Sequence, residues 1–403
     1  MHRTLFLFSI WLATLLPVSN NSIKISFRVM EEPLWSNYLT KKYPEIHICN
    51  RKIGNRYDYL KGKYTYYIAI NLFDNEEILP AMIHNLMKLI NQYFIPKNVF
   101  LRVYESASSD KTKDMLHEFH SLLNKYDVNH EIETSPIHNN KRDVNRIEHL
   151  IKMRNYAMIP VLKRRLKADH VLFLNDILFC YNDMLELIHQ QHLNKAYLTG
   201  GLDFNISPSG SFVFYDSWVT QDINGRHGHG GGPVLHQPDK DRVEKNLPVQ
   251  MMCTWNGMVA INATIFETLD MGFRRGMNGK KGERTPGECS ASEISALCID
   301  MIKNGFGKIL MVPDVKVSYG VKAYNILRNE QKDITNLFPY NSPQTPENDI
   351  PIEWKPFGQK QDCWPYFDGD RGRDKIEKGN YEEDLPAIAY HVSKNESKTF
   401  LIQ

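Results

Sequence analysis

The stretch Val171-Leu172-Phe173-Leu174-Asn175-Asp176-Ile177-Leu178-Phe179 places a polar pair inside an otherwise apolar run. Short apolar runs rich in Val, Ile and Phe are typical of buried strands, so we predict a strand over 171–179. A carboxylate inside such a run is costly unless it is paired, hydrogen-bonded or bound to a metal. Asp176 therefore either binds a ligand at the carboxyl edge of a sheet or caps the next helix, which is predicted to begin near Asn182.

The residues around this stretch predict alternating strands and helices. In the first half we predict strands over 66–72, 99–104 and 130–133 and helices over 78–93, 111–126 and 146–162. Strands separated by helices of this length indicate βαβ units and a parallel sheet. The second half is more mixed, with strands predicted over 196–199, 212–215, 250–252, 258–261 and 308–312 and a helix over 291–304. The predicted fold class is α/β, a mixed and mostly parallel sheet flanked by helices.

The whole chain has the composition of an ordinary globular protein. Its 403 residues suffice for one large or two ordinary domains, and its net charge of +2 gives no basis for a nucleic-acid site or a polybasic membrane patch. The predicted organisation is an N-terminal segment 1–22, a stem or extension 23–62, an α/β domain 63–320 and a C-terminal extension 321–403 that packs on the domain or is partly disordered.

The N-terminal segment indicates entry into the secretory pathway. An apolar run from Leu5 to Val18 follows His2 and Arg3. It is short for a membrane span, which needs roughly 17–25 residues. A cleaved signal peptide and a short type II signal anchor both fit this pattern, and a buried N-terminal helix is the third alternative. We therefore expect a location in the lumen of the Golgi or ER, with membrane contact only through this segment if it is not cleaved.

Sequons and cysteines agree with a luminal chain. N-x-[ST] triplets occur at Asn20, Asn205, Asn262 and Asn395. The six cysteines could form up to three disulfides in that compartment. No two of them have C-x-x-C spacing, which favours structural disulfides over a zinc site and leaves their pairing open.

Two polar constellations in the first half are candidates for ligand binding. The segment 105–112, which contains Glu105 and Ser106, follows a predicted strand and opens a helix. Its backbone N–H groups could face an anion or a ribose, or only cap the helix. Arg146 and Arg154 lie about two turns apart on the next predicted helix, nearly on one face, where guanidinium groups suit a diphosphate. A solvated basic face is the alternative for most of these cations, so only Arg154 is kept as a candidate.

Acidic and aromatic residues are interleaved in the second half. Asp203, and then Asp216 with Trp218, lie in short clusters of the kind that carbohydrate sites use, although each residue alone also has a turn or core explanation. Carboxylates accept hydrogen bonds from sugar hydroxyls, and aromatic faces cover the C–H surface of the ring. Trp255 and Asn256 interrupt two apolar runs, either as a sugar or acceptor contact or as a tight turn.

Two further segments each allow two interpretations. Glu293 could face the acceptor hydroxyl or the sugar, but Ser290 to Glu293 also has the spacing of a capping box. The segment His227-Gly228-His229-Gly230-Gly231-Gly232 has two histidines without a third ligand in register. For this segment we favour a mobile surface loop that closes over substrate rather than a metal site.

Taken together, motifs in one order along the chain resemble glycosyltransferase family 69, the fungal α-1,3-mannosyltransferases related to capsule-associated proteins. Each motif alone is short, but their shared order is specific at the level of the family. The tail segment 363–365 is similar more loosely. The resemblance runs from Tyr66 to Tyr319 and rests on Ile68–Leu72 with Asn75–Glu77, Glu105–Ser106, Arg154–Asn155, Phe173–Asp176, Gly201–Phe204, Tyr215–Trp218, Trp255–Gly257, Glu288–Glu293 and Gly305–Lys308.

The resemblance implies a GT-A-type fold in a type II membrane protein of the secretory pathway. It implies transfer of mannose from GDP-mannose to a glycan acceptor, with an α-1,3 linkage and with Mn²⁺ or another divalent cation. Carried over to this chain, it makes Asp176 the metal ligand. The sequence has Leu-Asn-Asp in place of a strict Asp-x-Asp, and because Asn brings no charge, the number of protein ligands stays open.

The remaining candidates fall into three groups. Those expected beside the nucleotide sugar are Asn71, Glu105, Ser106, Arg154 and Asn175. The candidate catalytic residues are Asp203, Asp216 and Glu293. The candidate sugar or acceptor contacts are Trp218, Trp255 and Asn256.

An α-linked product from an α-linked donor means retention, and the sequence leaves open whether a carboxylate attacks or the acceptor enters on the same face.

Two other functions compete with that of a mannosyltransferase. A glycoside hydrolase would need two opposed carboxylates without a nucleotide site, which the strand–turn–helix at 105–112 disfavours. A non-catalytic carbohydrate-binding or scaffold protein that retains the transferase fold is the second alternative, and the uncharged Asn175 leaves room for it.

Overall fold

The computed structural model describes residue 41, residues 54–135, 146–234, 236–268, 272–276, 292–328 and 349–358, and short strands between 360 and 384. The predicted signal segment 1–22 lies outside these residues. Within them, no helix is both long and apolar enough to cross a membrane. Tyr57 and Leu60 are fully buried in the core, so at least the end of the predicted stem belongs to the folded domain.

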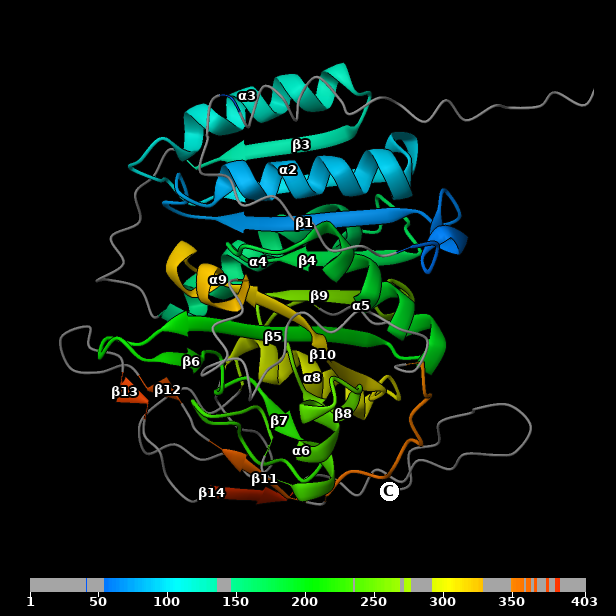
Figure 1. Ribbon diagram of the computed structural model, residues 1–403, viewed down its shortest axis with the longest axis vertical. Coiled ribbons are helices and arrows are strands. Elements are labelled where there is room, and N and C mark those ends of the chain that lie inside the picture. The colour runs from blue at the N-terminus through cyan, green and yellow to red at the C-terminus, as the bar shows by residue number, and fades with distance from the viewer. Residues whose placement is uncertain are drawn as a thin grey trace, which may run out of the picture.

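A mixed ten-stranded sheet forms the centre of the molecule (Figure 1), in the order β3-β2-β1-β4-β9-β5-β10-β8-β7 with β6 paired to β5. β3, β2, β1 and β4 are parallel neighbours. β9 is antiparallel to both β4 and β5, and β10 is parallel to β5. The strands of this sheet are β1 (Tyr66–Leu72), β2 (Val99–Glu105), β3 (Asn129–Thr134), β4 (His170–Leu174), β5 (Leu198–Ile206), β6 (Phe212–Phe214), β7 (Gln221–Asp222), β8 (Val249–Cys253), β9 (Met258–Asn262) and β10 (Ile309–Ser318).

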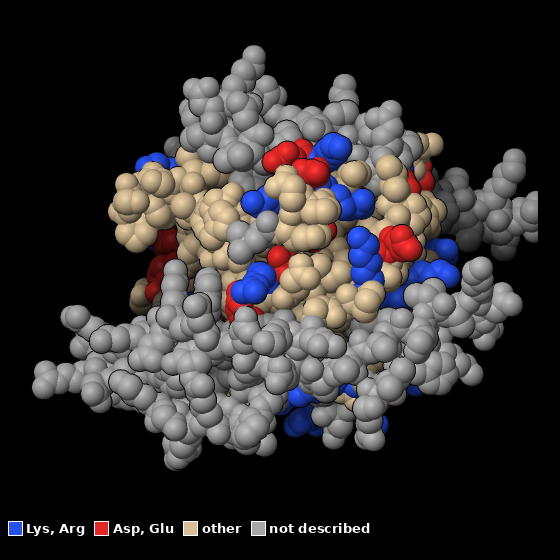
Figure 2. Space-filling view, turned by 90° about the horizontal axis from the view of Figure 1, so that it is seen from below, with Lys and Arg blue, Asp and Glu red and all other residues tan. Residues whose placement is uncertain are grey.

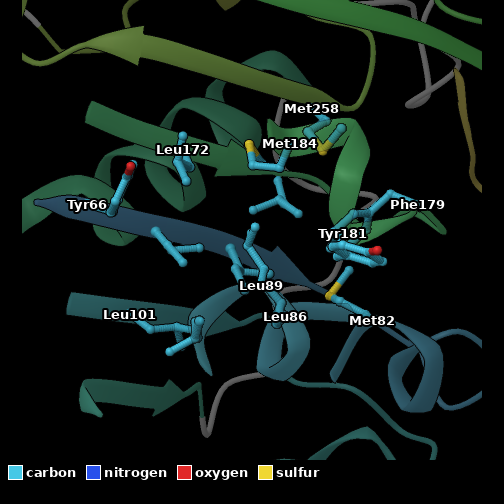
Figure 3. Close-up of a cluster of buried hydrophobic side chains, with 14 of the residues drawn as sticks. Tyr66, Met82, Leu86, Leu89, Leu101, Leu172, Phe179, Tyr181, Met184 and Met258 are labelled. Carbon is cyan, nitrogen blue, oxygen red and sulfur yellow. The ribbon is translucent and has the colours of Figure 1, made fainter. Parts of the chain in front are cut away.

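Helices cover both faces of the sheet, as is usual where strands are parallel. Alternate residues of β1 enter different cores: Ile68 and Ile70 pack in the core that contains α2, α3 and α5, and Tyr67 and Ala69 pack in the core that contains α4 and α8. Figure 3 shows the first core, with Leu101 and Leu172 of the sheet and Leu86 and Leu89 of α2 among its side chains. The helices are α2 (Leu79–Leu89), α3 (Thr112–Lys125), α4 (Arg146–Leu162), α5 (Tyr181–Asn194), α6 (Gln237–Glu244), α7 (Thr264–Thr268), α8 (Glu293–Lys303) and α9 (Val321–Arg328).

The α/β class with a mostly parallel first half is confirmed, and three predicted strand boundaries are wrong. The strands predicted over 196–199 and 308–312 extend to Ile206 and Ser318. The strand predicted over 171–179 ends at Leu174. Its continuation turns away because the backbone N–H of Asn175 donates to Gly257 at 2.8 Å and that of Ile177 donates back to Asn175 at 2.9 Å. The apolar residues after Asp176 therefore enter the core from a loop.

The C-terminal part is partly tied to the domain. α9 is a helix that the sequence pattern did not predict. In the segment 349–358, the Trp354 indole donates to the Asn194 carbonyl at 3.1 Å. Lys355 and Gln250 exchange two hydrogen bonds of 2.8 Å. Farther on, β11 (Lys360–Cys363) pairs with β14 (Tyr381–Asp384), and β12 (Tyr366–Phe367) with β13 (Lys375–Ile376).

Candidate active site

The carboxyl ends of the parallel strands meet along one edge of the sheet. Leu72 of β1 lies opposite Glu105 of β2, and β4 runs beside β1 in the same direction. β5 and β10 also run in this direction, with Asp203 opposite Val317. Because β9 is antiparallel to β4, the loop from β8 to β9 reaches the same edge. Polar side chains from all of these strands and loops can therefore converge there.

Asp176 lies directly beyond β4 and is half-buried. Its Oδ2 accepts a hydrogen bond from Asn75 Nδ2 at 3.3 Å. The capping role considered for Asp176 is wrong, because α5 is capped by Asp183, whose Oδ2 accepts the backbone N–H of Cys180 at 2.7 Å. The Asp176 carboxylate thus belongs to the sheet edge, where α/β folds bind ligands.

A buried ion pair lies next to this edge. Arg154 on α4 donates from Nε to Glu293 Oε1 at 2.8 Å, and the two side chains are 10% and 2% exposed. The guanidinium carbon also lies 5.3 Å from the ring centroid of Phe173 and 5.1 Å from that of Trp255. The positive charge is therefore shielded from water and balanced by one carboxylate.

Glu293 is not part of the capping box that its spacing suggested. Ser292 is the N-cap of α8, and its hydroxyl accepts the backbone N–H of Ser295 at 3.1 Å. The Glu293 side chain binds Arg154 instead, and its second oxygen, Oε2, has no hydrogen-bond partner among the described residues. That oxygen is buried and remains able to accept a hydrogen bond.

Asp203 and Asp216 form a second acidic centre. Asp203 is fully buried on β5, and its Oδ1 accepts from Asn256 Nδ2 at 3.0 Å and from the Asp216 backbone N–H at 3.1 Å. Burial raises the pKa of Asp203 to about 6, although these hydrogen bonds oppose the shift. Burial and the nearby charges of Asp203 and Glu293 raise the pKa of Asp216 to about 7. The pair can therefore hold a proton near neutral pH.

The turn between β8 and β9 supports these carboxylates. Asn256 and Gly257 both have positive φ, 46° and 78°. A side chain at Gly257 would place its Cβ 2.9 Å from Ile177 Cγ2, so glycine is needed for the close approach. Trp255 and Asn256 are fully buried, and Asn256 contacts Asp203. Their role as sugar or acceptor contacts stays a prediction.

The segment after β2 is held by carboxylates of its own and of the loop after β1. The backbone N–H of Ser108 donates to Glu105, that of Ser109 to Asp74 at 2.8 Å, and that of Thr112 to Asp110 at 2.9 Å. Only the Thr112 amide belongs to α3, so the capping interpretation holds for that amide alone. An anion would have to displace acidic side chains to reach any of the three.

Asn71, Glu105 and Ser106 lie at the ends of β1 and β2. Asn71 Nδ2 donates to the Met153 carbonyl at 2.9 Å, and Ser106 Oγ lies 3.0 Å from Met153 Sδ. Asn71 Oδ1 and Glu105 Oε2 are buried acceptors without partners among the described residues. These atoms could accept hydrogen bonds from a bound nucleoside, and the role stays a prediction.

The His-Gly segment is only partly at the surface. His227 is 2% exposed, and burial lowers its pKa to about 4, so the ring is neutral at physiological pH. Its Nε2 lies 3.1 Å from the Asp362 carbonyl. Gly230 and Gly231 are exposed, and the N–H of Gly231 donates to His229 Nδ1 at 3.0 Å. The expected surface position thus holds for the part from His229 to Gly231 but is wrong for His227, Gly228 and Gly232, which are buried. His227 connects the loop to the C-terminal part.

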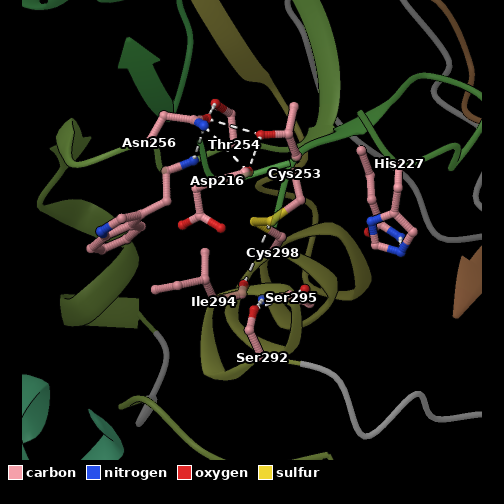
Figure 4. The surroundings of a disulfide bond; sticks show 12 residues. Asp216, His227, Cys253, Thr254, Asn256, Ser292, Ile294, Ser295 and Cys298 are labelled. Atoms are coloured by element: carbon pink, nitrogen blue, oxygen red, sulfur yellow. Dashed lines mark hydrogen bonds between the residues drawn. A yellow bond between two sulfur atoms is a disulfide. The ribbon is translucent and has the colours of Figure 1, made fainter. Parts of the chain in front are cut away.

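A disulfide fixes the helix that carries Glu293. Cys253 at the end of β8 is bonded to Cys298 of α8, as Figure 4 shows. The close-up also shows Asp216 and Asn256 above this bond. Cys180 is disulfide-bonded as well. The prediction of structural disulfides is confirmed for these cysteines.

Charges of both signs are mixed on the surface. On the face seen in Figure 2, basic and acidic side chains are interspersed over the described residues. This distribution agrees with the net charge of +2.

The structure connects the predicted site residues by hydrogen bonds into two groups. One group contains Arg154, Asn175, Glu293 and Trp255. The other contains Asp203, Asp216 and Asn256. Trp218 is half-buried in the segment between β6 and β7. Sequence reasoning missed Tyr319, whose hydroxyl accepts from Asn175 Nδ2 at 2.9 Å. It also missed Asn75 as the partner of Asp176. Both lie just beyond strands or in loops, and the order of strands that brings them to the site is not visible in a local pattern.

Comparisons with known proteins agree with one another. Residues 65–300 match the family model described as Cryptococcal mannosyltransferase 1. The chain is 27% identical over 332 residues to an alpha-1,3-mannosyltransferase, CMT1, of Cryptococcus neoformans, a match that covers 75% of this chain and 69% of that protein.

Two solved structures are also similar in fold. A crystal structure of GalNAc-T7 with UDP, GalNAc and Mn²⁺ has a TM-score of 0.41 and 16% identity, and the match covers 63% of this chain and 43% of that chain. The mannosyltransferase PcManGT from Pyrobaculum calidifontis in complex with GDP-Man and Mn²⁺ has a TM-score of 0.36 and 13% identity, with 76% of this chain and 75% of that chain covered. The chain thus spans less than half of the GalNAc-T7 structure.

Proposed function

Because the chain belongs to the capsule-associated mannosyltransferase family and is therefore a glycosyltransferase, we infer that its α/β fold is of the GT-A type. We propose that it transfers mannose from GDP-mannose to a glycan acceptor, with retention, in an α-1,3 linkage. The curated relative is named as an alpha-1,3-mannosyltransferase, which supports the sugar and the linkage. The observation that carries the proposal is Asp176, a half-buried carboxylate at the carboxyl end of β4 beside the Arg154–Glu293 pair.

The donor set fits a hard divalent cation such as Mn²⁺ that is held largely by the nucleotide. The described residues contain no group of three His, Cys, Asp or Glu side chains placed to hold a metal. Hard cations in nucleotide sites are commonly bound by one or two carboxylates together with substrate phosphates. Asp176 would supply that carboxylate, and the bound cation would neutralise charge on the leaving diphosphate.

The second acidic centre lies where the sugar and acceptor would meet the protein. Glycosyl transfer passes through an oxocarbenium-like state, which carboxylates stabilise. Asp216 is half-buried and therefore within reach of a ligand, whereas Asp203 is fully buried and hydrogen-bonds to the backbone of Asp216. We assign Asp216 to the sugar or acceptor and Asp203 to holding Asp216 in place.

The sequons, the N-terminal apolar run and the Cys253–Cys298 disulfide support a place in the lumen of the secretory pathway. Attachment there would be through the N-terminal segment if it is not cleaved.

The test combines binding with product formation. Isothermal titration should detect GDP-mannose binding to the wild type that needs Mn²⁺, and Asp176→Ala should lose it. Asp114→Ala, at an exposed position of α3, is the matched control. Product formation from GDP-mannose, and from no other nucleotide sugar tested, on α-mannoside acceptors would complete the assignment. Nucleotide binding that is absent or independent of metal would sink the proposal and favour the non-catalytic sugar-binding alternative.

A further inference from the structure

The side chain of Asn175 has hydrogen-bond partners on every side. Its Oδ1 accepts from Arg154 Nη1 at 3.0 Å and lies 3.4 Å from Trp255 Nε1. Its Nδ2 donates to the Tyr319 hydroxyl at 2.9 Å. Arginine and the indole ring are donors only, so the amide oxygen must face them and the amide nitrogen must face Tyr319. The orientation of the amide is therefore determined by its neighbours.

We propose that Asn175 is a positioning residue that links the Arg154–Glu293 pair to Tyr319, which is tied to β5 next to Asp203, and that it is not a ligand of the cation. The inference rests on the proposed cation-dependent transfer. A carbonyl oxygen accepts with two lone pairs, and both are directed to protein donors here. A cation at Oδ1 would have to displace the Arg154 and Trp255 contacts. Of the polar pair at the end of β4, Asp176 would then be the residue that binds the metal.

The chain of contacts reaches both acidic centres. Arg154 joins Asn175 to Glu293. On the other side, Tyr319 accepts from Asn175 and is tied to β5 next to Asp203, because its backbone N–H donates to the Phe204 carbonyl at 3.4 Å. Asp203 in turn accepts from the backbone N–H of Asp216 at 3.1 Å. Asn175 therefore couples the side of the site that would hold the diphosphate to the side that would hold the sugar.

This arrangement explains why an amide stands where a carboxylate is expected. An ionised Asp at this position could not donate to Tyr319, because a carboxylate only accepts. It would also place another negative charge close to Asp176 and Glu293. Asn keeps the acceptor for Arg154 and donates to Tyr319, whereas with Asp the Tyr319 hydroxyl would have to turn and become the donor.

The test separates a positioning role from metal ligation. Binding of Mn²⁺ in the presence of GDP is measured by titration calorimetry, and the kcat and KM of transfer are measured on the same variants. For Asn175→Asp we expect Mn²⁺ affinity within about twofold of wild type, at least a tenfold lower kcat and a smaller change in KM for GDP-mannose. Tyr319→Phe removes the same hydrogen bond without adding charge and should also lower kcat without changing Mn²⁺ affinity. Tenfold tighter Mn²⁺ binding by Asn175→Asp, the result expected if the new carboxylate joined the metal, would overturn the proposal.

A double-mutant cycle on kcat gives a second readout, which does not rely on measuring Mn²⁺ affinity. Asn175→Asp should cost much less in a Tyr319→Phe background than in the wild type, since the shared hydrogen bond is already lost. Additive effects would contradict the proposal. If wild type forms no product, the proposed function fails, and the cycle is then read on the unfolding midpoint with Asn175→Ala and Tyr319→Phe. Asn124→Asp on the exposed side of α3 controls for the charge change alone.

Discussion

Arg154 and Glu293 carry opposite charges in a place that water barely reaches. The two residues are 139 positions apart in the chain, and their ion pair joins α4 to α8. Removing one partner of a buried pair leaves an uncompensated charge, which costs more than the pair itself contributes.

Glu293→Ala should therefore lower the free energy of unfolding by about 3–5 kcal/mol, measured by urea denaturation. The double variant Arg154→Met with Glu293→Leu, which replaces both charges by apolar side chains, should lose less. A loss below about 1 kcal/mol for the single variant would be the behaviour of a solvated surface pair and would contradict the burial described here.

The raised pKa of Asp203 predicts that the stability of the protein depends on pH. Its folded-state pKa of about 6 is above the ordinary value of 3.8. The folded protein therefore binds more protons than the unfolded chain between these values, so this residue makes the protein less stable as pH rises from about 4 to about 6. Asp203→Asn, which cannot titrate, should gain stability relative to wild type over that range.

The gain should be on the order of 2–3 kcal/mol, since each pKa unit corresponds to about 1.4 kcal/mol. It is measured as the difference in unfolding free energy between variant and wild type from pH 4 to pH 8. Asp114→Asn, on the surface of α3, should show no such trend. A difference that falls or stays flat as pH rises would refute the raised pKa.

At the scale of elements, the turn from β8 to β9 is a tight connection that sets the position of Asn175. The Gly257 carbonyl accepts the backbone N–H of Asn175 at 2.8 Å. Because β9 is antiparallel to β4, this turn closes directly over the end of β4. A small displacement of Gly257 would therefore displace the polar pair.

Gly257→Ala should be destabilising by about 2 kcal/mol or more and should weaken nucleotide-sugar binding. Positive φ alone costs about 1 kcal/mol for a residue with a side chain. The added contact with Ile177 at 2.9 Å increases this cost. Gly210→Ala is the matched control, since Gly210 has φ +86° and no atom within 4 Å of the added Cβ. Equal losses for the two variants in thermal unfolding would show that the close approach to Ile177 has no effect.

Many elements could be predicted from local patterns. The helices over 111–126 and 146–162 correspond to α3 and α4, which the structure places at Thr112–Lys125 and Arg146–Leu162. The strand over 171–179 was drawn too long, because an apolar run is equally compatible with a buried strand and with a buried loop. β4 ends at a hydrogen bond to a residue far along the chain. A local sequence pattern carries no information about such a contact.

At the scale of the whole molecule, the C-terminal segment 349–358 fastens distant parts together. Asp349 forms ion pairs with Arg56 at 2.6 Å and with His189 at 2.8 Å. The backbone N–H of Ile352 donates to Asn194 Oδ1 at 2.8 Å. The segment thus connects the N-terminal part of the described chain to α5 and, through Lys355, to β8.

Deletion of residues 349–403 should lower the melting temperature by at least about 4 °C, since each kcal/mol shifts it by about 2–4 °C in domains of this size. Circular dichroism on heating measures this change. A shorter deletion of residues 385–403 leaves the contacts of the segment 349–358 in place and should have a smaller effect. Equal melting temperatures for the longer deletion and the full chain would show that the segment does not stabilise the fold.

The candidate site was predictable as a set of residues but not as an arrangement. Asp176 was singled out because a carboxylate inside an apolar run needs a partner, and Arg154 because guanidinium groups suit a diphosphate. Glu293 was singled out as a carboxylate at the start of a predicted helix. Which partner each one takes depends on the strand order β4-β9-β5-β10, which brings Asn256 to Asp203 and Tyr319 to Asn175. Tyr319 carries no charge, and the residues next to it in the sequence did not indicate that it belongs to the site.

The amino-acid sequence by itself determined the alternation of strands and helices, the family and the carboxylate beyond β4, because periodicity, turn chemistry and motif order are local properties. Only the tertiary structure decided that the amide of Asn175 is held between Arg154 and Tyr319 and that Asp183, not Asp176, caps α5. Those outcomes depend on which distant groups meet at the sheet edge. The physical reason is that hydrogen bonds act over about 3 Å, while the residues that form them here lie up to 144 positions apart.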